Sequence, residues 1–150
     1  MRLYEAIILS TLLYSADVWP LTTTLTKRLN AAHHRWQRSI LGISWKDRVT
    51  NEEVRGRTGQ HSMDDILSER RLRWLGHVIR MVNQRIPRQV LHWEVLGFKR
   101  GAGRPRTNWR STVNKDLLRM GITWEEVEVA AQDRSEWRRS VAQCIHLDAG

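Results

Sequence analysis

Apolar residues recur at helical spacing along the whole chain, and no strand-like alternation continues for more than four residues. Leu25, Leu29, Ala32, Trp36 and Ile40 follow one another at steps of three or four residues, which places them on one face of a helix. A strand exposed on one side needs an alternation with a period of two, which is missing here. The sequence therefore predicts an all-α fold of about six or seven short-to-medium helices.

Capping residues set the limits of these helices. Thr50 with Glu53, and Thr123 with Glu126, have the spacing of capping boxes. Ser62 is placed to cap the longest helix, and Asp133 or Ser135 to cap the last one. Gly42 and Gly121 follow apolar periodic segments and are expected to end helices. The expected helices cover residues 3–19, 25–40, 63–82, 87–95 and 109–120, with short ones after Thr50 and Thr123 and a last one carrying Trp137, Val141 and Ile145.

One segment interrupts the helical pattern. Residues 97–106, GFKRGAGRPR, hold four basic residues, three glycines and a proline, a composition typical of a loop. We therefore expect a helical region over residues 1–96, a basic loop over 97–106 and a C-terminal helical part over 107–150.

The first segment, residues 3–19, is apolar enough to require comparison with a membrane span. It is short for a bilayer and contains Glu5 and Asp17, and it lacks the basic start and cleavage site of a secretory signal. We interpret it as a core helix and expect no membrane. A helix that is apolar on nearly all sides needs cover on most of them, so part of this cover is expected to be missing from the chain.

Charge is sorted along the sequence. The chain of 150 residues has a net charge of +9, and residues 69–119 alone hold thirteen basic and three acidic side chains. Residues 1–68 carry a net charge of +2 and residues 120–150 one of −3. A basic segment of this kind favours nucleic acid as the partner, template–primer duplex of RNA or DNA included. The alternative is that the arginines only keep the chain soluble.

A basic stripe follows the helix expected over residues 63–82. Arg70, Arg73, His77 and Arg80 are spaced by three, four and three residues and so line one face. The alternative is a solvated face with Glu69 as the local acidic partner. Residues 103–106, GRPR, resemble the core of an AT-hook, although a phosphate-contacting loop is the favoured interpretation. The predicted nucleic-acid-binding residues are Arg70, Arg73, His77, Arg80, Arg100, Arg104, Arg106 and Arg110.

Tryptophan could stack on bases, but four of the eight tryptophans are spaced with aliphatic residues at helical intervals. We assign these four to packing: Trp36, Trp74, Trp109 and Trp137.

No catalytic set is recognisable. Asp64 and Asp65 follow Met63, as in the metal-binding turn of polymerases, but the next residues have helical and not strand spacing. Acidic residues behind Ser62 also suit the first turn of a helix, which is the interpretation we prefer. The six histidines and Cys144 lack metal-ligand spacing, and there is no phosphate-binding glycine loop or serine elbow. The chain is expected to have no catalytic residues, no metal, no cofactor and no small-molecule substrate.

The order of several short blocks is distinctive. They are residues 3–14 (LYEAIILSTLLY) with Trp19, residues 38–53 (RSILGISWKDRVTNEE), residues 70–78 (RRLRWLGHV), residues 85–87 (RIP), residues 103–106 (GRPR) leading to Trp109, and residues 131–134 (AQDR) leading to Trp137 and Arg138. Through these blocks the chain resembles the C-terminal part of reverse transcriptases from non-LTR (LINE-type) retrotransposons.

The resemblance implies a parent that is an RNA-directed DNA polymerase with an endonuclease domain. The blocks correspond to its thumb and C-terminal extension, which would make residues 1–96 thumb-like. The metal-binding aspartates, and with them Mg²⁺, belong to a palm that this chain lacks. We therefore expect a non-catalytic fragment that binds nucleic acid and contacts a missing palm, inside the cell in the nucleus or cytoplasm. The alternatives are a stand-alone basic nucleic-acid-binding protein and a non-functional structural remnant.

Overall fold

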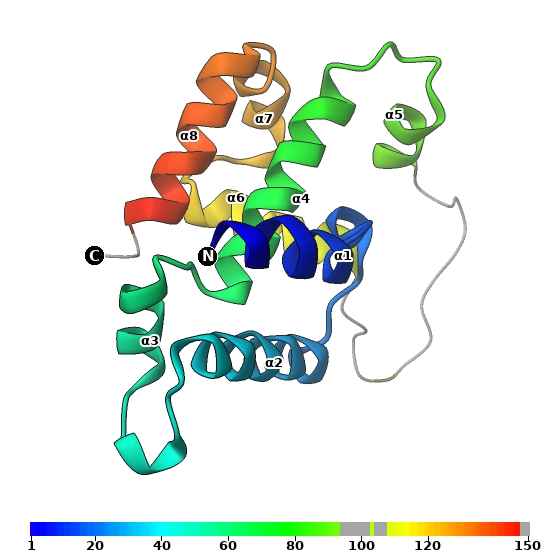
Figure 1. Ribbon diagram of the computed structural model, residues 1–150. Coiled ribbons are helices and arrows are strands. Elements are labelled where there is room, and N and C mark those ends of the chain that lie inside the picture. Colours follow the sequence, from blue (N-terminus) through cyan, green and yellow to red (C-terminus); the bar gives the residue numbers. More distant parts are fainter. Residues whose placement is uncertain (94–102, 104–107, 148–150) are drawn as a thin grey trace.

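The computed structural model describes residues 1–93, 103 and 108–147, and these residues form helices and turns without a strand (Figure 1). The predicted all-α fold is confirmed. Three short segments, η1 to η3, accompany the α-helices; η1 is π-helical and the other two are 3₁₀-helical. In chain order the elements are η1 (Tyr4–Leu9), α1 (Ser10–Leu12), η2 (Ala16–Val18), α2 (Thr23–Leu41), η3 (Trp45–Asp47), α3 (Asn51–Thr58), α4 (Met63–Ile79), α5 (Ile86–Leu91), α6 (Trp109–Arg119), α7 (Trp124–Ala130) and α8 (Arg134–Leu147).

The predicted caps are found at several helix ends. Ser62 Oγ accepts a hydrogen bond from the backbone N–H of Asp65 at 3.2 Å, so Ser62 is the N-cap of α4. Thr123 and Glu126 form a complete capping box at α7. Gly42 ends α2 in the left-handed conformation, with φ at 67°. These bonds lie within five residues of chain, and the sequence therefore predicted them correctly.

The ends of two expected helices differ from the prediction or cannot be compared with it in full. α4 ends at Ile79, three residues before the predicted end, and Val82 is exposed. α5 ends at Leu91, whereas its predicted end, Val95, lies outside the described residues. Most of the predicted loop at 97–106 also lies there, so the division at this loop stays a prediction.

The N-terminal segment differs from the single core helix that we expected. Helical residues run from η1 into α1, the chain turns at Ser15 with φ at 58°, and η2 follows and packs on α4. Tyr4, Leu9 and Leu13 are buried on one side, whereas Leu3 and Ile7 on the other side face solvent. The expectation of a core helix is therefore met on one side only. Among the described residues, no helix has the length and apolar character that crossing a membrane requires.

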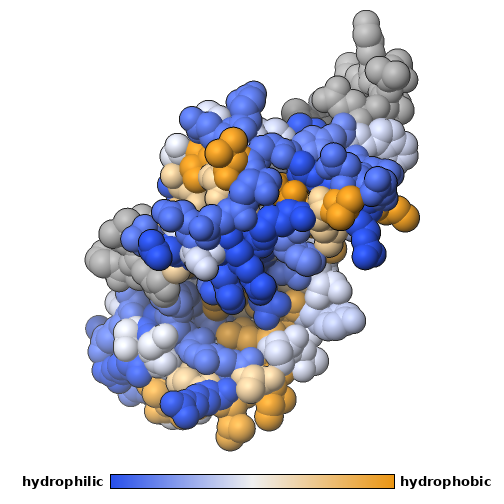
Figure 2. Space-filling view, turned by 90° about the horizontal axis from the view of Figure 1, so that it is seen from above, coloured by the Kyte–Doolittle hydropathy of each residue, from blue (hydrophilic) through white to orange (hydrophobic). Residues whose placement is uncertain are grey.

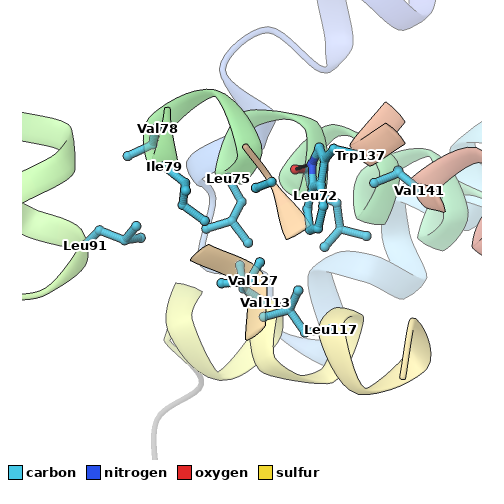
Figure 3. Packing of buried hydrophobic residues seen from close by; sticks show 11 residues of the cluster. Leu72, Leu75, Val78, Ile79, Leu91, Val113, Leu117, Val127, Trp137 and Val141 are labelled. Atoms are coloured by element: carbon cyan, nitrogen blue, oxygen red, sulfur yellow. Dashed lines mark hydrogen bonds between the residues drawn. The ribbon is translucent and has the colours of Figure 1, made fainter. Parts of the chain in front are cut away.

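Helix α4 runs through the middle of the molecule and contacts η2, α2, α5, α6 and α8, whereas α3 packs on α2 (Figure 1). Its C-terminal half forms a core with α5, α6, α7 and α8 (Figure 3). Its N-terminal half packs against the N-terminal segment and α2 in a second cluster. The first cluster contains Leu72, Leu75, Val78, Ile79, Leu91, Val113, Leu117, Val127, Ala131, Trp137 and Val141.

A tryptophan and a glycine fix the crossing of α4 and α8. The Trp137 ring is fully buried, and its Nε1–H donates a 2.9 Å hydrogen bond to the backbone carbonyl of Leu72 (Figure 3). That ring lies against the backbone of Gly76, where a Cβ atom would stand 2.5 Å from Trp137 Cδ1. Only glycine allows this approach, because any larger residue would overlap the ring.

We expect Gly76→Ala to lower the free energy of unfolding by about 1–3 kcal/mol, the usual cost of overpacking a core. Gly56 is the matched control, since it also lies within a helix but has open space around its Cα. Gly56→Ala should raise stability by about 0.5–1 kcal/mol, through helix propensity alone. Urea denaturation followed by circular dichroism measures both, and equal effects would contradict the close approach of α8.

Two adjacent buried histidines on α2 have contacts that suit the neutral state. His33 Nε2–H donates to the carbonyl of His61 at 3.0 Å, so Nδ1 must accept the 2.7 Å hydrogen bond from the Tyr4 hydroxyl. His34 has the opposite tautomer, because Nδ1–H donates to the Asn30 carbonyl and Nε2 accepts from Arg55. Burial lowers the pKa of both histidines, in agreement with these contacts.

This arrangement predicts that acid destabilises the fold. The unfolded histidines gain protons near pH 6.5, whereas the folded ones resist protonation until a lower pH. Their contribution to stability is thus fully present above about pH 6.5 and is lost as the pH falls from there toward the folded pKa values. We expect the free energy of unfolding to decrease between pH 7.5 and 5.5, and His33→Gln to reduce that decrease. A pH dependence that His33→Gln leaves unchanged would contradict the assignment.

Candidate nucleic-acid interface

Basic side chains from α4 and α8 converge on one surface hollow. The hollow has a volume of about 300 Å³. It is lined by Arg73 and His77 of α4, by Arg80 at the C-cap of α4, and by Arg134, Trp137 and Arg138 of α8. No carboxylate is among the described residues that line it. We call this group of four arginines and His77 the α4–α8 cluster. Figure 2 views the molecule from the end where α4 finishes and α8 begins, and hydrophilic residues cover most of that face.

The helix crossing explains why these side chains meet. Arg134 and Arg138 are four residues apart and therefore share one face of α8, beside the Trp137 ring that packs on Gly76. Arg80 Nη1 donates a 2.6 Å hydrogen bond to the carbonyl of Ala131, just before α8. Burial lowers the pKa of Arg80, and the nearby charge of Arg134 lowers it further. Positive groups held together in this way favour an anion between them.

The predicted stripe on α4 is divided by its neighbours. Arg70 donates to the backbone carbonyl of Leu13 at 3.2 Å and so helps to hold the N-terminal segment. It lines a second hollow that also contains Asp17 and Glu69. Arg73 borders both hollows and forms a 2.5 Å ion pair with Glu69. The structure thus joins Arg73, His77 and Arg80 in one site and places Arg70 beside acidic groups.

The other predicted binding residues lie elsewhere. Arg110, on α6, stacks over the Trp124 ring with its guanidinium carbon 4.9 Å from the ring centroid. Arg100, Arg104 and Arg106, together with most of the GRPR segment, lie outside the described residues.

Some arginines of the basic segment are structural. Arg71 is buried in α4, and its Nε donates to Asp116 Oδ2 at 2.7 Å. Ser68 completes this network by donating to Asp116 Oδ1 at 2.8 Å. Arg88 of α5 likewise pairs with Glu128 of α7 at 2.6 Å. The surplus of positive charge that the sequence indicates is therefore larger than the charge available for a ligand.

Sequence reasoning missed Arg134 and Arg138. They lie in the C-terminal segment, whose net charge of −3 concealed them. Their four-residue spacing on either side of Trp137 is a signal that could have been used, since it places both beside a buried ring on the last helix.

The two adjacent aspartates lie in the first turn of α4. Asp64 Oδ2 accepts from Asn30 at 2.7 Å, and Asp65 Oδ1 accepts from Arg119 at 2.8 Å. Side chains of α2 and α6 therefore bind both carboxylates, and the position of the two residues behind the N-cap Ser62 agrees with the preferred interpretation. The part of the chain that the structure describes contains no group of three or more metal-ligating side chains placed to hold an ion.

The four tryptophans assigned to packing do pack against the cores. Trp137 is fully buried, and Trp36, Trp74 and Trp109 are partly buried against the two clusters. Trp74 and Trp109 meet edge to face with ring centroids 5.2 Å apart. Trp109 Nε1–H also donates to the carbonyl of Asp17 at 2.7 Å, which ties α6 to η2.

Comparison with known proteins shows similarity to a transposon-derived protein. An uncharacterised transposon-derived protein of Caenorhabditis elegans is 24% identical to the chain over 144 residues, which is 91% of this chain and 52% of the relative. The chain thus spans about half the length of the curated relative that it matches. No protein-family model and no solved structure matches the chain. The similarity supports a transposable-element origin.

We expect Asp116→Ala to lower the free energy of unfolding by about 3–5 kcal/mol, because it leaves the buried Arg71 guanidinium without its counter-ion. Glu53→Ala is the control, since it removes an ion pair with Arg57 that is half exposed at both partners. That change should cost less than about 1 kcal/mol. Urea denaturation compares the two, and similar losses would mean that Arg71 is not a structural arginine.

Proposed function

We propose that this chain is the nucleic-acid-binding region of a transposon-derived protein, and that it corresponds to the thumb and C-terminal extension of a non-LTR retrotransposon reverse transcriptase. Its ligand is a template–primer duplex. The main observation in support is the α4–α8 cluster, in which four arginines and a histidine line one hollow without a carboxylate among the described lining residues. The resemblance of the sequence blocks and the transposon-derived relative support the same origin.

The cluster would bind the duplex through its backbone. Arginine guanidinium groups make paired hydrogen bonds to phosphate oxygens, and such contacts position a duplex without reading its sequence. Arg80 is already fixed by the Ala131 carbonyl, so part of the site is ordered before a ligand arrives. Arg73 would leave Glu69 for a phosphate, since this ion pair is half exposed on the arginine side and therefore weak.

The chain itself is proposed to be non-catalytic. Polymerase chemistry in the parent would belong to a palm domain with bound Mg²⁺, and Asp64 and Asp65 do not replace it because both are held by neighbouring side chains. We propose the palm as the partner of the exposed apolar side of η1 and α1, where Leu3, Ile7 and Tyr14 face solvent.

A stand-alone basic nucleic-acid-binding protein is the second candidate, and the same cluster supports it. The two differ in what precedes Met1 in the genome: a reading frame with palm motifs, even one interrupted by stop codons, favours the reverse-transcriptase origin. The third candidate is a structural remnant without a ligand. It would not bind a duplex, whereas the other two candidates would.

We expect the chain to bind a 20-base-pair DNA duplex without sequence preference and with strong salt dependence. Each phosphate contact contributes about −0.9 to the slope of log K against log salt. Four arginine contacts give a slope of about −4, or a loss of roughly two to three decades between 50 and 200 mM salt. The triple change Arg73→Gln, Arg134→Gln and Arg138→Gln should flatten that slope by about three, as fluorescence anisotropy can measure.

The control is a variant with the same change in net charge. Arg2, Arg28 and Arg139 are exposed and line neither the hollow of the α4–α8 cluster nor the hollow beside Arg70, so replacing all three by Gln should alter the slope much less. Equal losses in the two triple variants would mean that positive charge acts as a diffuse field. The α4–α8 cluster would then not be the binding site, and a structural role would become the better interpretation.

A further inference from the structure

A second basic surface lies on the hairpin formed by α2, η3 and α3. Its turn projects at the end of the molecule opposite to the start of α8 (Figure 1). At this turn Trp45 is 83% exposed, although most tryptophans of the chain are buried or partly buried. The indole of Trp45 is therefore open to solvent and offers a flat face on which a base can stack.

The turn that carries Trp45 is well ordered. The backbone N–H of Ser44 donates to Asp47 Oδ2 at 2.6 Å. The Ser44 hydroxyl accepts a hydrogen bond from a backbone N–H of η3, and the two bonds form a capping box. Arg48 follows in the left-handed conformation, with φ at 51°. Arg38 of α2 then donates to the Val49 carbonyl at 2.6 Å and to Asn51 Oδ1 at 3.0 Å. The ring is thus presented on a fixed backbone, which lowers the entropy lost when a ligand binds.

The hairpin is strongly basic. Residues 23–58 contain eight basic and three acidic side chains, a net charge of +5. The net charge of +2 for residues 1–68 as a whole does not show this. Two of the acidic groups have local roles, since Asp47 closes the capping box and Glu53 pairs with Arg57. Acidic residues before and after the hairpin, including Asp17 and Asp64, account for the smaller net charge of residues 1–68.

A hollow of about 660 Å³ lies along α2 beside the turn. Lys27, Arg35 and Arg38 line it, and no carboxylate is among its described lining residues. Asn30, Ser39 and Asn51 add neutral polar side chains, and Ile43 also lines the hollow. The hollow therefore offers cations and neutral polar groups, and the exposed ring of Trp45 follows two residues after its lining residue Ile43.

We infer that this hairpin binds single-stranded nucleic acid, with a base stacked on Trp45 and the backbone phosphates along Lys27 and Arg35. Aromatic stacking needs an unpaired base, because the faces of bases inside a duplex are covered by their neighbours. The charge along the hollow favours a nucleic acid over an apolar protein segment. This inference goes beyond the duplex binding proposed for α4 and α8, since both the surface and the ligand differ.

The experiment uses a fluorescein-labelled 20-nucleotide oligo-dT and the whole chain. Trp45→Ala should weaken binding about tenfold or more, the effect expected for loss of one stacked base. Trp45→Phe should keep most of the affinity, because it retains an aromatic face. Trp93 is the matched control. It is 70% exposed and follows α5, a helix that Figure 1 shows away from the hairpin, so Trp93→Ala should change affinity less than twofold.

A second pair of variants tests the phosphate path. Lys27→Gln with Arg35→Gln should weaken oligo-dT binding more than Arg2→Gln with Arg139→Gln, which gives the same net charge. Arg38 is left unchanged because it holds the turn. Circular dichroism melting confirms that each variant is folded.

Three results would overturn the inference. The first is unchanged oligo-dT binding by Trp45→Ala, and the second is an equal loss in Trp93→Ala. The third is an equal loss for oligo-dT and for the 20-base-pair duplex in Trp45→Ala, which would exclude preference for an unpaired base. The Arg73, Arg134 and Arg138 variant reports on duplex binding separately, so failure of one proposal is distinguishable from failure of the other.

Discussion

The close approach of Trp137 to the backbone of α4 at Gly76 determines the arrangement of the C-terminal half of the molecule. The buried indole donates its Nε1–H to the Leu72 carbonyl, and the missing Cβ of Gly76 leaves room for the ring. α8 is thereby held along α4, and the core formed by α5, α6 and α7 closes around the same stretch of helix. The α4–α8 cluster is a direct consequence, because the arginines on either side of Trp137 are brought to those of α4.

The arginines of this protein perform different tasks, and burial and partners distinguish them. Arg71 is buried with Asp116 and joins α4 to α6, while Arg88 joins α5 to α7 through Glu128. Arg38 orders the turn before α3. Those of the α4–α8 cluster share a hollow that no described carboxylate lines, which suits an anionic ligand. Planar guanidinium groups suit both tasks, since they bond carbonyls and carboxylates in the core and phosphates at the surface.

The two proposed surfaces lie at different ends of the molecule and differ in character. The α4–α8 cluster offers charge without an exposed ring, which suits the continuous phosphate backbone of a duplex. The α2–α3 hairpin offers charge together with an exposed indole, which suits unpaired bases. A protein that acts on a template–primer meets both forms of nucleic acid at once, and the proposed transposable-element function would use both surfaces.

The sequence by itself determined the local structure. Helical spacing gave the all-α class, and Ser62, Thr123, Asp133 and Gly42 marked helix ends correctly, because a capping bond or a left-handed turn depends on residues within a few positions of one another. Only the tertiary structure decided which charges are available. Arg71 is buried and pairs with Asp116, which is 45 residues away in the sequence. Arg134 and Arg138 join the cluster because Trp137 packs on Gly76. Such pairings depend on how helices cross, which is set by shape complementarity between distant residues and leaves no periodic signal in the chain.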